Sequence, residues 1–375
     1  RIPDYQRGYA WQKDQLEDFW RDLVNLSDSG THYTGALTLK KICKEKINND
    51  DNEYWLIDND SYDIYHVIDG QQRLTTAIVF IQSFCEVVRG LDKYPTKNDE
   101  KILINDSKHL SDIVKEYLYK SKPGEIICTY KFGYTKDDPS DEYLRYEILD
   151  EDGKGSPIKT YYTLNLKNAR KYFLAKLKDI SKKEGLDKLN KIYKKLTTKF
   201  KFNEYIIEDD FDIFVAFEAM NNRGKPLSNL ELLKNRLIYL TTLYSEDKLE
   251  PDESKDIREA INGAWKEIYK QLGRNAKHPL SDDEFLKAHW IMFFQYKRIK
   301  GDDYIKFLLN EKFSPRNVYK NNESAVDLEL PVERHADFDD SDDAENTMEQ
   351  LDDANENSKI FLEPSEIKKY VESLK

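Results

Sequence analysis

The chain has 375 residues, more than one typical domain and fewer than three, and 35% of them are charged. No stretch approaches the roughly 18–20 apolar residues that a membrane helix needs, so the sequence excludes a membrane-spanning protein. The 25 Tyr, 17 Phe and five Trp exclude a disordered chain, because so much aromatic surface must be buried, and the net charge of −12 argues against a generic nucleic-acid binder.

The first half of the chain mixes helical and strand patterns. Apolar residues at helical intervals predict a helix over 13–26, and alternation predicts a strand over 35–42. We expect two further strands at 54–57 and 64–68 with a hairpin around 58–60, a buried helix over 74–88, and strand-like pieces at 126–132 and 146–149.

The second half is mainly helical. Helices are predicted at 164–182, 186–198, 211–221, 228–244, 254–272, 282–298 and 302–309, with a short strand at 205–207. The fold class is therefore α+β. We predict an N-terminal domain over 1–160, a mainly helical domain over 161–315, and an acidic linker with a terminal amphipathic helix over 316–375.

The charge is unevenly spread along the chain. Residues 337–357 hold ten Asp and Glu with no Lys or Arg, whereas residues 165–201 hold thirteen Lys and Arg against three acids. The net charge therefore describes the acidic run more than the rest of the chain. The acidic run is either a disordered loop or a tether, and the basic segment is either a solvated helix face or a phosphate-facing surface.

Cysteine and histidine show no metal or disulfide pattern. The three cysteines are widely spaced, and the six histidines form no HxxxH pair. A reducing cytoplasm is the expected location, because no signal peptide is visible. The sequence also contains no P-loop and no dinucleotide-binding glycine fingerprint.

The run Asp69-Gly70-Gln71-Gln72-Arg73 separates a predicted strand from a predicted helix. A helix start presents N–H groups and the positive end of its dipole to an anion. Gly70 permits a backbone geometry or a close approach that a side chain would block. Arg73 suits phosphate oxygens, and Asp69 suits a metal-bound or nucleophilic water. The alternative is a capped turn in which Arg73 pairs with a structural carboxylate.

Four other side chains extend this candidate site. The amides of Gln71 and Gln72 suit a base, a ribose or a water. Thr75 and Thr76 add hydroxyl groups in the first turn of the predicted helix.

The N-terminal segment interleaves aromatic and polar residues: Tyr5, Gln6, Arg7, Tyr9 and Trp11. This pattern suits stacking on a base combined with contact to the phosphate backbone. An arm that packs its aromatic rings onto the core explains the pattern equally well.

A third polar cluster lies between two predicted helices, at 221–228. It offers Arg223 and Lys225 beside a helix start, and Ser228 with Glu231 forms a capping box. The cluster suits either an anion site or a well-capped helix hairpin.

Three runs together resemble one known family. They are IPDYQRGYAW at 2–11, VIDGQQRLTT at 67–76 and FEAMNNRGKPLSNLELLKNRL at 217–237. Their order is similar to that of the DGQQR-bearing domain of GmrSD-type, modification-dependent restriction proteins, which also occurs in SspE and BrxU. The resemblance covers about residues 1–310. It implies an N-terminal domain of the ParB/sulfiredoxin type followed by a helical region.

The resemblance also implies nucleoside triphosphate (NTP) hydrolysis with Mg²⁺ at the DGQQR turn. It makes Asp69, Gln71, Gln72 and Arg73 catalytic candidates, with Asp69 near Mg²⁺. The nucleotide-binding candidates are Gly70, Thr75, Thr76, Asn221, Arg223, Gly224 and Lys225. Tyr5, Gln6, Arg7, Tyr9 and Trp11 become candidates for the same site or an adjacent DNA-reading surface.

These restriction proteins usually carry a His- and Asn-rich nuclease domain after the helical region, and no such constellation is visible in this sequence. We therefore expect no nuclease activity from this chain alone and expect a further domain or subunit to supply it. The leading hypothesis is an NTP-hydrolysing sensor of modified DNA in an anti-phage system. The alternatives are a non-catalytic DNA-binding or regulatory subunit that recruits a nuclease, and a helical scaffold that holds a partner subunit.

Overall fold

The protein was studied as a computed structural model. The structure describes residues 1–43, 53–59, 62–92, 94, 98–105, 108–125, 128–135, 139–150, 158–207, 227–274, 281–295, 303–319 and 361–375. No helix within these residues is both long and apolar enough to cross a membrane.

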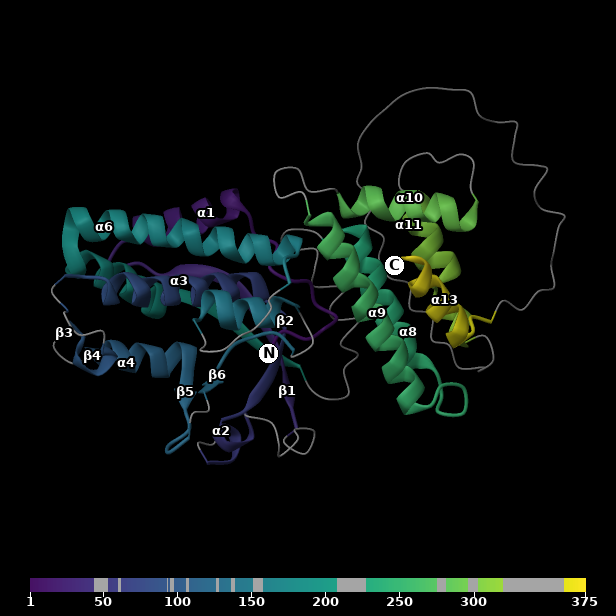
Figure 1. The fold of residues 1–375 in the computed structure, drawn as a ribbon, viewed down its shortest axis with the longest axis horizontal. Helices are drawn as coiled ribbons and strands as arrows, with labels where there is room; N and C mark the ends of the chain where they lie inside the picture. The colour runs from purple at the N-terminus through teal and green to yellow at the C-terminus, as the bar shows by residue number, and fades with distance from the viewer. Residues whose placement is uncertain are drawn as a thin grey trace, which may run out of the picture.

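Two apolar cores lie side by side, each built by a different part of the chain (Figure 1). The helices of the first core are α1 (Lys13–Asn25), α3 (Gln71–Arg89) and α6 (Tyr161–Lys199). The helices of the second core are α8 (Asn229–Leu243), α9 (Pro251–Leu272), α10 (Asp282–Phe294) and α13 (Pro364–Ser373). The α+β class is confirmed, and the strands among the described residues all lie in the first part.

A three-stranded sheet borders the first core. Its order is β2 (Ile64–Asp69), β1 (His32–Ile42), β7 (Phe200–Ile207), with β1 antiparallel to β2 and parallel to β7. Val67 and Phe200 belong to the first core, whereas Ile68 belongs to the second. The end of β2 therefore lies between the two cores and positions the DGQQR turn there.

Short elements complete the two parts. In the first they are α2 (Tyr54–Asn59), a 3-10 turn (Asp99–Lys101), β3 (Leu103–Asn105), β4 (Lys108–His109), α4 (Leu110–Ile113), a π-helical turn (Val114–Leu118), β5 (Tyr119–Ser121), β6 (Cys128–Tyr130), α5 (Pro139–Glu142) and a π-helical turn (Tyr143–Ile148). In the second they are α11 (Asp303–Lys306), a π-helical turn (Phe307–Lys312) and α12 (Arg316–Tyr319).

Two predicted strands are wrong. The expected strand at 54–57 is helix α2, and β1 pairs directly with β2 instead. The expected strand at 146–149 overlaps the π-helical turn at Tyr143–Ile148. Both segments are short apolar runs, and periodicity alone does not separate a strand from a helix over so few residues.

Helix α6 contributes to both cores. Most of its buried apolar residues belong to the first core and Tyr162 belongs to the second, whereas the predicted boundary at 160/161 assigns all of α6 to the helical domain. At Gly185 the backbone takes φ 75° and ψ −168°, so the helix breaks between the two predicted helices. The domain boundaries and the ParB-like detail remain predictions. The predicted helix at 211–221 and the acidic run at 337–357 lie outside the described residues.

Candidate functional site

The N-terminal arm, residues 1–12, is held by the two glutamines of the DGQQR turn. Gln71 Nε2 donates to Gln6 Oε1 at 2.7 Å, and Gln6 Nε2 donates to the carbonyl oxygen of Ile68 at 2.8 Å. Gln72 Nε2 donates to the carbonyl oxygen of Gly8 at 3.0 Å, and the Ala10 amide donates to Gln72 Oε1 at 2.8 Å. The structure thus brings the first two sequence motifs together, although more than 60 residues separate them.

The next polar side chains of α3 face inward. Thr75 and Thr76 are buried, and each hydroxyl donates to the carbonyl four residues earlier at 2.8 Å. Tyr9 is completely buried, and its hydroxyl lies 2.7 Å from Thr76 Oγ1. In this conformation the Tyr9 ring packs in the core, and the hydroxyls of Thr75 and Thr76 are hydrogen-bonded inside the protein, so their predicted binding roles remain predictions.

Arg73 binds the backbone of the neighbouring strand. Its Nη1 donates to the carbonyl oxygen of Thr34 at 2.6 Å, and its Nη2 donates to that of Ala36 at 3.0 Å. Asp69 Oδ2 is 3.4 Å from Nη2, a long contact. The guanidinium therefore stabilises β1, while both charged side chains stay partly exposed.

Two glycines make this arrangement fit. Gly70 has φ +93° at the N-terminus of α3, a conformation that favours glycine, as the sequence predicted. Gly35 has φ +114°, and a Cβ there would lie 1.6 Å from Arg73 Nη1. Gly35 was not predicted from the sequence, because nothing near it in the chain indicates that an arginine side chain packs against it.

The third motif is only partly described. Asn221, Arg223, Gly224 and Lys225 lie outside the described residues, so their contribution remains a prediction. The capping box is confirmed: the Ser228 side chain accepts from the Glu231 amide, and Glu231 accepts from the Ser228 amide at 2.9 Å.

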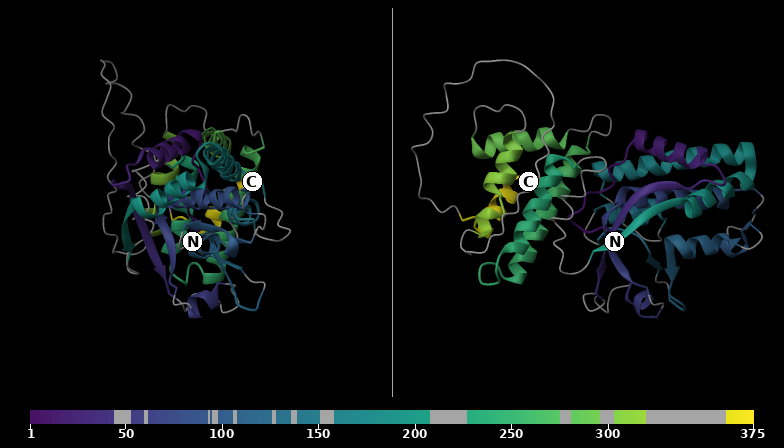
Figure 2. Two further views of the ribbon diagram at one scale, coloured as in Figure 1. Left: turned by 90° about the vertical axis from the view of Figure 1, so that its left-hand side faces the viewer. Right: turned by 180° about the vertical axis from the view of Figure 1, so that it is seen from behind.

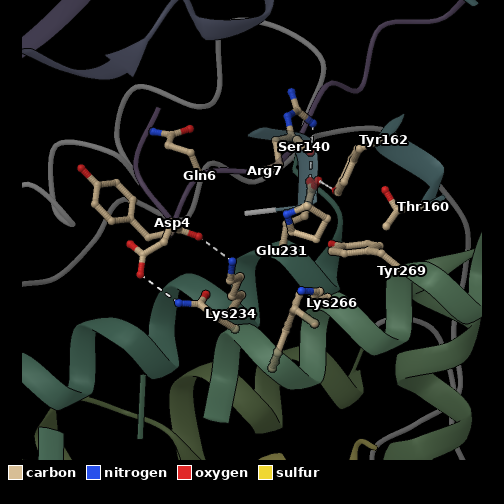
Figure 3. A pocket seen from close by; sticks show the side chains of 15 residues that line it. Asp4, Gln6, Arg7, Ser140, Thr160, Tyr162, Glu231, Lys234, Lys266 and Tyr269 are labelled. Carbon is tan, nitrogen blue, oxygen red and sulfur yellow. Dashed lines mark hydrogen bonds and ion pairs between the residues drawn. The ribbon is translucent and has the colours of Figure 1, made fainter. Parts of the chain in front are cut away.

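A pocket opens where the arm meets the second core (Figure 3). Its walls come from the arm, α5, the start of α6, α8 and α9, and the described residues that line it do not include those of the DGQQR turn. Its principal polar lining residues are Asp4, Gln6, Arg7, Tyr162, Glu231, Lys234, Asn262 and Lys266. Gln6 connects this pocket to Gln71, so the pocket and the turn form one polar region.

The pocket contains a buried carboxyl group, that of Glu231. Burial raises the pKa of this group, while the Arg7 guanidinium, 3.5 Å away, opposes that rise. Tyr162 donates its hydroxyl to the same carboxylate. Burial raises the pKa of Tyr162 well above its usual value, so this hydroxyl keeps its proton. The contacts of Arg7 and Tyr162 with Glu231 therefore join the arm and α6 to α8.

Asp4 joins the arm to α8 and α9. Lys234 Nζ donates to its backbone carbonyl, and Asn262 Nδ2 donates to its carboxylate at 2.9 Å. Asn262 Oδ1 is buried and has no hydrogen-bond partner among the described residues. Lys266, half-buried on the same wall, makes no ion pair within the described part of the chain. Both groups are free to meet a ligand.

Gly8 explains why the arm approaches α6 so closely. A Cβ at this position would lie 2.5 Å from the Tyr162 ring. Of the other arm candidates, Tyr5 is buried in the second core and Trp11 packs partly against the first. The sequence signal for the arm was its aromatic and polar content, and the structure shows that this content joins the two cores.

No group of three or more His, Cys, Asp or Glu within the described residues forms a metal site, so the Mg²⁺ that the resemblance implies stays a prediction. Mg²⁺ keeps several waters and takes one or two protein carboxylates together with substrate phosphates. Asp69 offers a partly exposed carboxylate for this purpose. Lys234, Lys266 and Arg7 supply positive charge near the pocket.

Fold and site together define a mixed α+β module that joins a helical region through a cationic, partly buried pocket. Residues 1–238 match the family described as the GmrSD restriction endonuclease N-terminal domain. This match covers more than half of the chain, so the chain belongs to that family, and its class is that of DNA restriction. A search of curated proteins finds no match.

Proposed function

We propose that this chain is the NTP-hydrolysing sensor module of an anti-phage system that restricts modified DNA. The pocket beside the DGQQR turn carries this proposal. Arg7, Lys234 and Lys266 line this partly buried pocket. Gln6, which also lines it, is hydrogen-bonded to Gln71 of the turn. Guanidinium and ammonium groups are the usual protein partners of phosphate oxygens.

We assign roles to the residues from their contacts and their chemistry. Lys266 has no competing acidic partner among described residues, so it binds a phosphate directly. Asp69 would hold Mg²⁺ or orient the attacking water. The ion would supply charge neutralisation at the phosphates. Arg73 keeps β1 and Asp69 in place through its three contacts.

The position of the pocket supports coupling between nucleotide and DNA. Arg7 and Asp4 reach from the arm to Glu231, Lys234 and Asn262 in the helical part. A triphosphate that attracts Arg7 or Lys234 competes with these contacts. A ligand shifts a conformational equilibrium only by such differential contacts, and this one would act directly on the junction of the two parts.

The test is phosphate release by the full chain with each NTP and Mg²⁺, with and without modified DNA. Lys266→Gln should reduce release by about tenfold or more, because one charge-assisted contact is worth roughly 1.5–3 kcal/mol. Lys255→Gln, an exposed lysine on the same helix, is the matched control. If wild type and Lys266→Gln release phosphate at the same background rate, the enzyme proposal fails.

The second candidate is a non-catalytic DNA-binding or regulatory subunit that recruits a separate nuclease. One observation favours it: Gln71, Gln72 and Arg73 are all engaged with backbone or side chains of the protein itself. NTP or DNA binding without phosphate release would select this candidate over the first.

A further inference from the structure

Strand β7 presents an exposed polar and aromatic face at the edge of the three-stranded sheet. Phe200 lies in the first core. Alternation along the strand turns Lys201, Asn203 and Tyr205 to the opposite face, where all three are exposed, with Tyr205 56% exposed. The described strands β2 and β1 lie on one side of β7 only. Tyr205 therefore presents a large aromatic ring to solvent.

A second tyrosine lies on the adjacent strand. Tyr33 of β1 pairs in register with Lys201 and is 62% exposed. The right-hand view of Figure 2 shows β1 and β7 side by side on the near side of the molecule. Tyr33 and Tyr205 are thus two exposed phenol rings on one sheet face, with Lys201 beside the first.

Two further exposed lysines lie on α6, which leads directly into β7. Lys191 and Lys194 are exposed and three residues apart, so they lie on one face of the helix. Neither they nor Lys201 form an ion pair within the described part of the chain.

Other lysines of α6 differ in this respect. Lys183, Lys188 and Lys195 lie 2.9, 3.2 and 3.7 Å from acidic partners. The positive charge of the helix is therefore neutralised at some positions and uncompensated at others. Some lysines of α6 thus carry positive charge without an acidic partner among the described residues, although the net charge of the chain is −12.

We propose that Tyr33, Lys191, Lys194, Lys201 and Tyr205 form the surface on which this protein holds DNA, here called the lysine–tyrosine surface. The lysines neutralise phosphates, and the two phenol rings stack on bases of an unpaired or distorted stretch. The inference rests on the proposed function for its DNA partner. It goes beyond that proposal because it assigns the contact to the β1–β7 face and the end of α6.

The chemistry of this surface favours DNA over an acidic protein. Three lysines without partners suit a regular row of phosphates, and aromatic rings on the same surface add a contact that every base can make. All five side chains are exposed, so they can be changed with little effect on the core.

The experiment measures DNA affinity of the full chain by fluorescence anisotropy at several salt concentrations. Labelled duplex and single-stranded DNA are compared, with and without the modification. The variants are Lys191→Gln/Lys194→Gln/Lys201→Gln and Tyr33→Ser/Tyr205→Ser. The matched control, Lys255→Gln/Lys368→Gln/Lys369→Gln, removes the same charge from α9 and α13.

We expect the lysine variant to bind at least about tenfold more weakly than the control. The slope of log affinity against log salt concentration should become shallower by roughly one unit for each phosphate that a lysine no longer neutralises. The tyrosine variant should bind single-stranded DNA about tenfold more weakly, with a smaller effect on duplex, because stacking needs an unpaired base.

Two outcomes overturn the surface assignment. One is that both surface variants bind DNA as the control does while wild type binds DNA and releases phosphate, which leaves the proposed function intact. The other is that the tyrosine variant changes the oligomeric state in light scattering and not the DNA affinity, which makes the face an interface between copies. If wild type binds no DNA under any condition, the proposed function itself fails.

Discussion

Gly35 of β1 lies so close to the guanidinium of Arg73 that no side chain fits at this position. Arg73 donates to the carbonyl oxygens on both sides of this glycine, at Thr34 and Ala36. Hydrogen bonds from a charged donor contribute more than neutral ones, so these two stabilise the strand strongly. A residue that resembles a phosphate ligand in the sequence thus has a structural role of its own.

The first prediction concerns this glycine. Gly35→Ala should lower the free energy of unfolding by about 3 kcal/mol or more, because it adds a clash with Arg73 to the strain of a positive φ. Gly124→Ala is the control: φ is +80° there, and nothing lies within 4 Å of the added Cβ. Urea unfolding of both variants separates the two effects. Equal destabilisation of the two variants would show that Arg73 moves aside freely.

The second prediction concerns Gln72, whose amide satisfies the Gly8 carbonyl and the Ala10 amide. Gln72→Leu leaves both backbone groups buried without this partner, which costs roughly 1–3 kcal/mol for each group. Hydrogen exchange should show reduced protection at Ala10 before global unfolding. Gln15→Leu, which removes an exposed side-chain contact to the Gln12 amide at the start of α1, should leave Ala10 protected. Unchanged protection in Gln72→Leu would contradict the proposed attachment of the arm.

At the scale of elements, strong periodicity predicts helices well. The predicted helices at 13–26, 228–244 and 254–272 match α1, α8 and α9 within a few residues. The predicted strand at 205–207 is only the end of β7, which begins at Phe200. Its first residues pair with β1 over 160 positions away, and such pairing leaves no local pattern in the sequence.

The candidate site shows the same limit. The sequence identified Gln6, Gln71 and Gln72 as unusual polar residues, and the structure brings them together. It did not indicate that they bind one another, because their contacts depend on how β2 ends between the two cores. Lys266 was missed altogether, since a lysine on an amphipathic helix has the pattern of an ordinary solvated residue.

The third prediction concerns helix α13, which completes the second core. Ile367 is fully buried there, and the ring of Tyr370 packs against Phe293 and Phe313 at centroid distances of 5.0 and 4.9 Å. Ile367→Asp should detach α13, because an unpaired buried charge costs several kcal/mol.

Proteolysis should then cleave the second core at lower urea than the first. Lys368→Asp, which changes the exposed neighbour on the same helix, is the control and should leave the cleavage pattern unchanged. Loss of both cores at the same urea concentration in Ile367→Asp would show that the two parts unfold as one unit.

At the scale of the whole molecule, the N-terminal arm belongs to both cores. Ile2 and Tyr9 lie in the first, whereas Tyr5 and Ala10 lie in the second. Between them, Arg7 reaches Glu231 and Asp4 reaches Asn262. A segment of about ten residues therefore determines how the α+β part contacts the helical part, and it does so beside the pocket proposed for phosphate.

The final prediction concerns pH and the buried Glu231. Burial, the largest influence, raises its pKa above the ordinary value of 4.5 in the folded state. The folded protein then holds a proton more tightly than the unfolded chain, so this group favours folding below pH 4.5 and loses that contribution as pH rises through the folded pKa.

Glu231→Gln removes the titration. Arginine stays charged throughout, so the Arg7 attraction varies with pH only through the ionisation of Glu231 and is already contained in the direction of that pKa. The free energy of unfolding of wild type relative to Glu231→Gln should therefore fall between pH 4.5 and 8, as measured by urea unfolding, with the exposed Glu259→Gln as the control. A difference that grows with pH would mean that attraction to Arg7 outweighs burial, and the two parts would then be held together by a true ion pair at neutral pH.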